Sequence, residues 1–179
     1  MPESAEKSLV LIVDDASANI RMLHSLLRDR HRVVFATSGD DALEQAARLL
    51  PDLILLDIIM PEMDGYEVCR RLKINLLTAD IPVIFITGCS DTEDVVQGFT
   101  LGAADYVVKP FRSGELLARV ATHLQLRQAR QELNRKNEEL EKLRADLEQG
   151  AEQNRLLAGE VDRLTRLIAD ENGDSFRKF

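Results

Sequence analysis

The segment of the sequence that is most informative about the fold is Asp-Leu-Ile-Leu-Leu-Asp-Ile-Ile-Met-Pro, residues 52–61. Its four apolar residues, Leu53 to Leu56, lead directly into one carboxylate, Asp57. A short and continuous apolar run is typical of a strand buried on both faces, as in a parallel sheet. The run therefore predicts a strand over 53–57 that places Asp57 at its open end.

Three other apolar runs also end in, or are followed by, polar residues. The remaining predicted strands, with the polar residues at their ends, are 8–13 with Asp14 and Asp15, 82–87 with Thr87, 105–108 with Lys109, and 32–36 without such a residue. Between these runs the apolar spacing changes to a helical period. The predicted helices are 16–29, 39–49, 64–73, 91–101 and one from 113 onward.

Strict alternation of strand and helix predicts an α/β fold, a five-stranded parallel sheet doubly wound with five helices. In such sheets ligands bind at the carboxyl ends of the strands. Asp14, Asp15, Asp57, Thr87 and Lys109 should therefore lie together at one edge of the sheet.

Composition excludes several classes of protein. The 179 residues carry a net charge of −8, and no basic stripe suits nucleic acid. No apolar run approaches the roughly 20 residues of a membrane span, and no secretory signal begins the chain. Two cysteines without metal-ligand spacing fit a reducing compartment. We expect a cytoplasmic protein that binds neither nucleic acid nor membrane.

A seven-residue repeat runs through the last third of the chain, in line with the fifth helix. The a positions are Leu126, Leu133, Leu140, Leu147, Asn154, Val161 and Ile168, and the d positions are Ala129, Lys136, Leu143, Gly150, Leu157, Leu164 and Glu171. This pattern predicts a coiled coil, and an Asn at a core position favours a parallel dimer in register. A lone amphipathic helix is the alternative. The predicted boundaries are a tail at 1–7, a domain at 8–122, the coiled coil at 123–170 and a frayed end at 171–179.

The polar residues at the strand ends suit a metal ion and a phosphoryl group. Three converging carboxylates repel one another, and Mg²⁺, which prefers oxygen ligands, would relieve that repulsion. Asp14, Asp15, Asp57 and the backbone carbonyl of Ile59 are the candidate ligands. Asp57 would also be the nucleophile that accepts a phosphoryl group.

Two further residues would contact the transferred group. The Lys109 ammonium would neutralise charge on a phosphoryl oxygen, and the Thr87 hydroxyl would offer a hydrogen bond. The acyl phosphate formed on Asp57 would be labile, so the modification would be temporary. Each residue alone also fits a structural role, such as a loop start or a solvated lysine.

Residues 8–122 resemble the receiver domain of two-component response regulators, the CheY-like family. The motifs that carry the resemblance are Val-Asp14-Asp15, Leu-Asp57-Ile-Ile-Met-Pro-Glu-Met-Asp-Gly, Ile-Thr87-Gly and Asp-Tyr106-Val-Val-Lys109-Pro110-Phe111. The resemblance implies a sheet of strand order 2-1-3-4-5 and a cis peptide bond before Pro110. It also implies that a histidine kinase or phosphotransfer protein phosphorylates Asp57.

The resemblance assigns two finer roles. Asp15 would bind Mg²⁺ directly and Asp14 partly through water. Thr87 and Tyr106 would form a switch pair that responds to phosphorylation. Ile59, two residues beyond Asp57, is apolar where a side chain of this family often borders the phosphoryl group, so we expect slow loss of phosphate.

Two classes of function remain open. The chain could be a signalling module, not itself an enzyme, that passes its state through a dimeric coiled coil to an unknown downstream partner. Alternatively, it could be the regulatory front of a larger enzyme, whose output domain follows the coil. Diguanylate cyclases, cyclic-di-GMP phosphodiesterases, serine phosphatases and some histidine kinases resemble that arrangement.

Overall fold

The computed structural model describes the backbone of residues 7–88, 96 and 98–175, with side chains as far as residue 166. The chain divides into two compact units, Met1–Ala129 and Arg130–Phe179. Among the described residues, no helix combines the length and the apolar composition that crossing a membrane requires.

One parallel sheet of five strands forms the centre of the first unit. The strands are β1 (Leu9–Val13), β2 (Arg32–Ala36), β3 (Leu53–Leu56), β4 (Val83–Thr87) and β5 (Asp105–Val108). Their order is β2-β1-β3-β4-β5, and every neighbouring pair is parallel. The predicted sheet and its order are confirmed.

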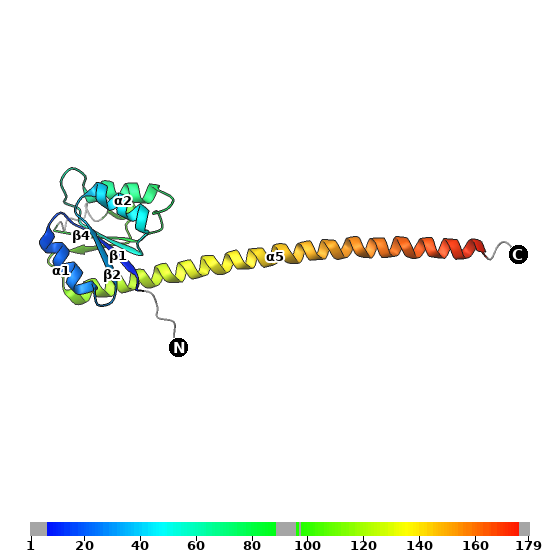
Figure 1. Ribbon diagram of the computed structural model, residues 1–179. Coiled ribbons are helices and arrows are strands. Elements are labelled where there is room, and N and C mark those ends of the chain that lie inside the picture. Colours follow the sequence, from blue (N-terminus) through cyan, green and yellow to red (C-terminus); the bar gives the residue numbers. More distant parts are fainter. Residues whose placement is uncertain (1–6, 89–95, 97, 176–179) are drawn as a thin grey trace. The chain divides into compact units, whose positions relative to one another are not determined.

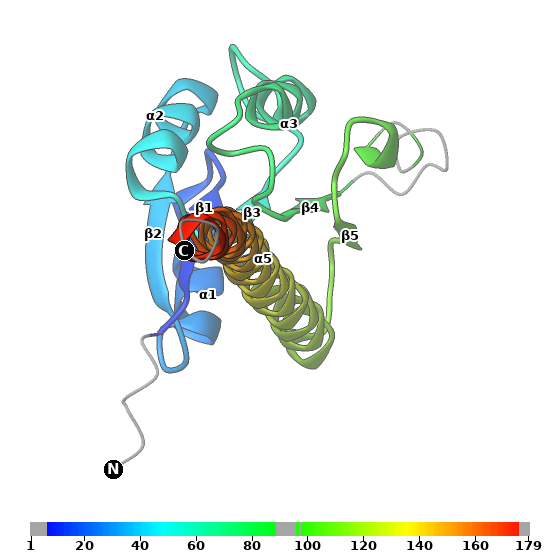
Figure 2. The ribbon, with the colours of Figure 1, turned by 90° about the vertical axis from the view of Figure 1, so that its right-hand side faces the viewer.

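Helices cover both faces of this sheet. They are α1 (Ser17–Leu27), α2 (Gly39–Leu49), α3 (Gly65–Ile74) and α5 (Ser113–Ser175). Figure 2 shows α2 and α3 on one face, with α1 and the first turns of α5 on the other. Most of the predicted helix 91–101 lies outside the described residues, although residues 98–100 are helical.

Each central strand contributes to two separate cores. Along β3, Ile54 and Leu56 pack beneath α2 and α3, whereas Leu53 and Leu55 pack against α1 and α5. Because side chains alternate along a strand, burial on both faces requires an unbroken apolar run. This is the physical reason for the run that precedes Asp57.

The strand that precedes Asp57 ends one residue earlier than predicted. β3 ends at Leu56, so Asp57 begins the loop that follows it. The backbone N–H of Asp57 still donates to the carbonyl of Val13, at 2.8 Å. Asp57 therefore remains fixed to the neighbouring strand although it lies outside the regular ladder.

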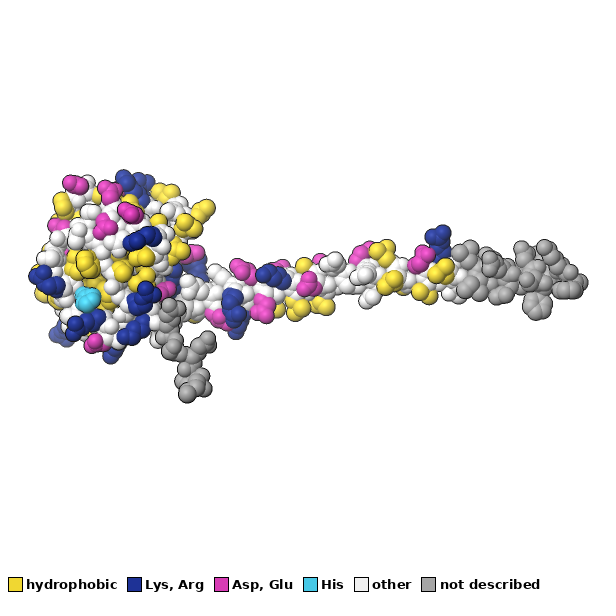
Figure 3. Space-filling view, in the orientation of Figure 1, with side chains coloured by type: hydrophobic (Ala, Val, Ile, Leu, Met, Phe, Trp, Pro, Cys, Tyr) yellow, Lys and Arg dark blue, Asp and Glu magenta, His cyan; other side chains and the backbone are white. Residues whose placement is uncertain are grey.

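The last helix changes its surroundings along its length. Leu116, Val120 and Leu124 of α5 are buried in the core beside α1. The leucines from Leu126 to Leu164 are half to two-thirds exposed in the single chain. The helix α5 continues to Ser175, past the predicted boundary at residue 170 (Figure 1). Apolar side chains recur along this part of the helix in Figure 3. The long helix is confirmed, and its pairing into a coiled coil stays a prediction.

Gly65 lets α3 approach the segment that carries Asp57. The side chain of Asp64 caps the helix by accepting from the N–H of Glu67 at 2.8 Å, and the N–H of Gly65 donates to the carbonyl of Ile58 at 2.9 Å. A Cβ added to Gly65 would lie 2.8 Å from the Cα of Ile58 and would also press on the carbonyl oxygen of Asp57. Backbone atoms cannot move aside as a flexible side chain can, so this close approach requires glycine.

We expect Gly65→Ala to lower the free energy of unfolding by about 1–3 kcal/mol, as overpacking in a rigid site does. Gly114→Ala is the matched control, because a Cβ there would meet no heavy atom within 4 Å. Chemical denaturation of both variants measures the difference. Equal stabilities would show that α3 does not need the close approach.

Candidate functional site

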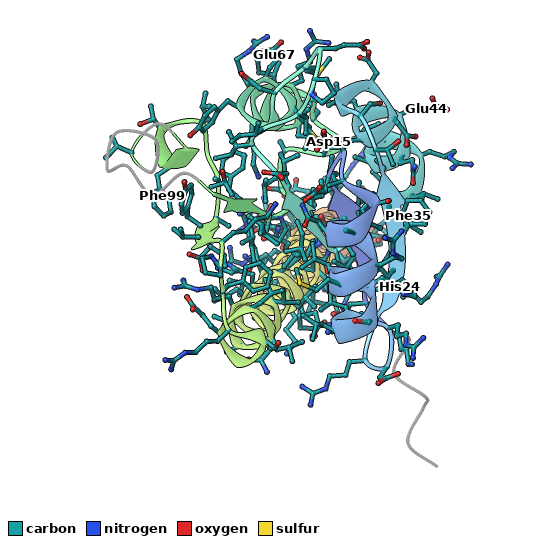
Figure 4. All side chains as sticks on the ribbon, turned by 90° about the vertical axis from the view of Figure 1, so that its left-hand side faces the viewer. Asp15, His24, Phe35, Glu44, Glu67 and Phe99 are labelled. Carbon is teal, nitrogen blue, oxygen red and sulfur yellow. The ribbon has the colours of Figure 1, made fainter. Side chains whose placement is uncertain are left out.

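The candidate site lies at the carboxyl ends of β1, β3, β4 and β5. The parallel sheet brings these ends to one edge, where Asp14 and Asp15 follow β1 and Asp57 follows β3. Figure 4 shows Asp15 at this edge, where the chain turns into α1. The residues predicted from the strand ends are therefore brought together.

Three carboxylates form the acidic part of the site. Oxygen atoms of Asp14, Asp15 and Asp57 all lie within 4.8 Å of one another. Asp14 and Asp57 are buried, whereas Asp15 is exposed. Two carboxylates are thus held away from bulk water, and the third faces it.

Asp14 is held in place by α1. Its Oδ1 accepts from the backbone N–H of Ala16 at 2.8 Å, and the side-chain amide of Asn19 donates to both of its oxygens at 2.9 Å. Sequence reasoning missed Asn19. One polar residue in the first turn of a helix is common, and only its spacing of five residues from Asp14 could have indicated the contact.

Lys109 connects two of the three carboxylates. Its Nζ lies 2.7 Å from Oδ2 of Asp57 and 3.1 Å from Oδ2 of Asp14. Burial alone would lower the pKa of Lys109, but hydrogen bonds and charges from Asp57 and Asp14 together leave it raised. Lys109 is therefore firmly protonated. The predicted cis peptide bond between Lys109 and Pro110 is present.

Burial raises the pKa of the Asp57 carboxyl, and the nearby charge of Asp14 adds to the effect. Lys109 and the N–H of Ile59 act in the opposite direction, the latter donating to Oδ1 at 3.3 Å. The site thus holds three carboxylates and the ammonium of Lys109, which leaves an excess of two negative charges when all three are ionised. A divalent cation with oxygen ligands fits that donor set.

Ile59, two residues beyond Asp57, is 62% exposed. Its backbone N–H contacts Asp57, as described above. The use of its carbonyl oxygen as a metal ligand stays a prediction.

The predicted switch residues lie on neighbouring strands. Thr87 is fully buried at the end of β4, and Tyr106 on β5 is 9% exposed. The Tyr106 ring meets Phe85 edge to face at a centroid distance of 6.5 Å, and Phe85 meets Tyr66 in the same way at 5.4 Å. Tyr106 is therefore packed in the core beneath α3, and its role as a switch stays a prediction.

A family model and two solved structures all identify a receiver-domain fold in this chain. The family model of the response regulator receiver domain matches residues 10–121. A Chloroflexus aurantiacus protein described as a putative response regulator superposes with a TM-score of 0.64 at 37% identity, covering 67% of this chain and 99% of that one. The activated receiver domain of DrrB superposes with a TM-score of 0.61 at 34% identity, covering 66% and 98%.

Two longer proteins are also similar in sequence to this chain. A Vibrio cholerae protein named as a probable cyclic di-GMP phosphodiesterase is 47% identical over 139 residues, which cover 78% of this chain and 32% of that protein. The response regulator PleD of Caulobacter vibrioides is 46% identical over 112 residues, which cover 62% and 25%. This chain thus spans a third or less of the length of these two relatives. With the family model matching more than half of its residues, the chain belongs to the response regulator receiver domain family.

Proposed function

We propose that this chain accepts a phosphoryl group on Asp57 from the phosphohistidine of a histidine kinase or phosphotransfer protein. The observation that carries the proposal is the contact of Lys109 with Asp57 and Asp14 beside a third carboxylate. Membership of the receiver family supports the same reaction. The proposed ligands of the required Mg²⁺ are Asp14, Asp15, Asp57 and the carbonyl of Ile59.

An oxygen of Asp57 would attack phosphorus in line with the leaving imidazole. The new O–P bond forms as the P–N bond breaks, and the imidazole nitrogen takes the bonding electrons and then a proton from water. No general base is needed because the carboxylate attacks in its ionised form. Bound Mg²⁺ would neutralise charge on the phosphoryl oxygens.

The other residues would hold the reacting groups. Lys109 would exchange its contact with Asp57 for one with a phosphoryl oxygen. Asn19 and the N–H of Ala16 keep Asp14 oriented. Thr87 would reach the phosphoryl group with its hydroxyl, and Tyr106 would respond to that movement as the second member of the switch pair.

Incubation with Mg²⁺ and acetyl phosphate tests the reaction. The intact mass of the wild-type chain should rise by one phosphoryl group, and the gain should vanish in Asp57→Ala or with excess chelator. Asp29→Ala, at a carboxylate that is 87% exposed, is the matched control and should be labelled like the wild type. Equal labelling of Asp57→Ala would contradict the proposal.

Ile59 should make the phosphorylated state long-lived. An exposed apolar side chain beside the acyl phosphate gives no hydrogen bond to an attacking water and restricts its approach. We expect Ile59→Asn to lose phosphate severalfold faster in an autodephosphorylation assay. Ile74→Asn, at a similarly exposed isoleucine at the end of α3, should leave the rate unchanged. An equal or slower rate in Ile59→Asn would contradict the expectation.

The proposed output is a parallel homodimer through the heptad residues of α5. In the single chain Leu133, Leu140, Leu147 and Val161 are each more than half exposed. Such a stripe is costly in water, and pairing with a second copy would bury it. Asn154 at an a position favours the parallel arrangement in register.

The double substitution Leu140→Asp and Leu147→Asp should convert a dimer into a monomer, because it places charges in the seam. Light scattering measures the change. The double substitution Glu138→Asp and Ala145→Asp is the control, since both residues lie at f positions, away from the seam. A wild-type monomer, or a dimer that survives the seam substitutions, would contradict the proposed pairing.

A second candidate function is the regulatory front of a larger enzyme. The 139-residue match to the Vibrio cholerae relative ends no earlier than residue 139, wherever it begins, and so reaches into α5. Similarity beyond the receiver domain is expected where the coil joins the domain to an output domain. The reading frame of the gene after residue 179 distinguishes the two candidates.

A further inference from the structure

The buried stripe of α5 ends in a charged residue. Leu116, Val120 and Leu124 pack into the core, and Arg127 is the next residue on the same side of the helix. Its side chain is only 13% exposed, although the leucines that follow are open to water. A cation thus occupies a position where an apolar side chain would have sufficed for packing.

Arg127 contacts the chain just before two strands, at the end of the sheet opposite Asp57. Its Nη1 donates to the carbonyl of Asp80, shortly before β4, at 3.0 Å. Its Nε lies 3.6 Å from Oδ1 of Asp52, the residue before β3, and has no hydrogen-bond partner among the described residues. Oδ2 of Asp52 in turn accepts from the N–H of Leu9, the first residue of β1, at 2.8 Å.

The next residue of the helix adds a contact. Gln128 donates from Nε2 to the hydroxyl of Ser8, at 3.3 Å. The guanidinium and this amide thus attach α5 to the beginnings of three strands. We call the contacts of Arg127 and Gln128 with Ser8, Asp52 and Asp80 the basal latch; all of its residues lie in the unit Met1–Ala129.

The latch lies beside the first heptad leucine. Leu126 is 60% exposed, and in a helix it points about 100° away from Arg127. Any roll of α5 on the sheet therefore changes the direction in which Leu126 is presented. Apolar packing by Leu124 resists such a roll weakly because it has no preferred direction, whereas hydrogen bonds and ion pairs have one.

The buried surroundings of Arg127 disfavour its positive charge. Burial lowers the pKa of Arg127, and the charges of Asp52 and Asp80 only oppose that effect. Half-buried ion pairs are often no more stabilising than apolar side chains of the same size, and in some proteins they fix a unique geometry. Fixing the geometry of α5 would be useful at Arg127, because there the helix leaves the receiver domain and enters the proposed coiled coil.

We propose that Arg127 is a positioning residue whose basal latch fixes the roll of α5 on the receiver domain. It thereby sets the phase in which Leu126 and the later heptad leucines meet a partner helix. The effect on the phase of the leucines rests on the proposed dimer, whereas the roll of α5 is a property of the single chain. Arg127 lies at the opposite end of the sheet from Asp57, so it takes no part in phosphoryl transfer.

Pairs of nitroxide labels test the latch in the full chain. The labels replace two exposed residues of the first unit, Glu44 on α2 and Gln125 on α5, in a background of Cys69→Ala and Cys89→Ala. Excess unlabelled chain ensures that only distances within one chain are measured. Pulsed electron spin resonance then gives the distribution of the distance, and the wild type should give one narrow population.

Arg127→Met should broaden this distribution about twofold or more, because an apolar side chain of similar length restores packing but leaves the roll free. Its unfolding midpoint should be no lower than that of the wild type. Asp52→Asn should broaden the distribution less, since its amide oxygen can still accept from Leu9. Arg135→Met is the control, because Arg135 is an exposed residue of α5 whose guanidinium pairs with Glu132 on the same helix, and it should change nothing.

An unchanged distribution in Arg127→Met, or equal broadening in Arg135→Met, would overturn the proposal. If Arg127→Met proves less stable than the wild type, the distance distribution of Asp52→Asn decides instead. A broader distribution would support the proposal, and an unchanged one would overturn it. Labelling with acetyl phosphate should match the wild type in every variant. A wild type that takes no phosphate would refute phosphoryl transfer, and the label distances would still decide the role of the latch.

Discussion

The contact between Lys109 and the carboxylates of Asp57 and Asp14 is the interaction on which the rest of the site depends. Burying two carboxylates beside a third is unfavourable unless a cation lies between them. The ammonium at 2.7 Å from Asp57 meets part of that requirement. The remaining negative charge makes the site receptive to a divalent cation, and so to an oxygen-rich group such as a phosphoryl.

The parallel sheet makes this contact possible and also separates the two ends of the domain. Asp14, Asp57 and Lys109 follow three different strands and meet because all strands run the same way. At the other end the beginnings of β1, β3 and β4 receive Arg127 and Gln128 of α5. The acidic site and the attachment of α5 therefore lie on the same sheet but use different residues.

The sequence predicts most of the sheet and the charged site, but it does not predict two contacts made by single polar residues of helices. The unbroken run before Asp57 reveals a strand buried on both faces, because each face needs its own apolar side chains. Asn19 and Arg127 carry no such signal. The first is one polar residue in a helix turn, and the second falls outside the a and d positions, where an exposed charge is expected. Only the folded chain shows that Asn19 binds Asp14, five residues away, and that Arg127 binds the carbonyl of Asp80, 47 residues away.

Chemical trapping of the phosphorylated residue shows directly whether Asp57 is the acceptor. Borohydride reduces an aspartyl phosphate to homoserine, so peptide mass mapping after reaction with acetyl phosphate and Mg²⁺ identifies the acceptor. We expect homoserine at position 57 alone. Homoserine at position 14 or 15, or at no position, would contradict this expectation.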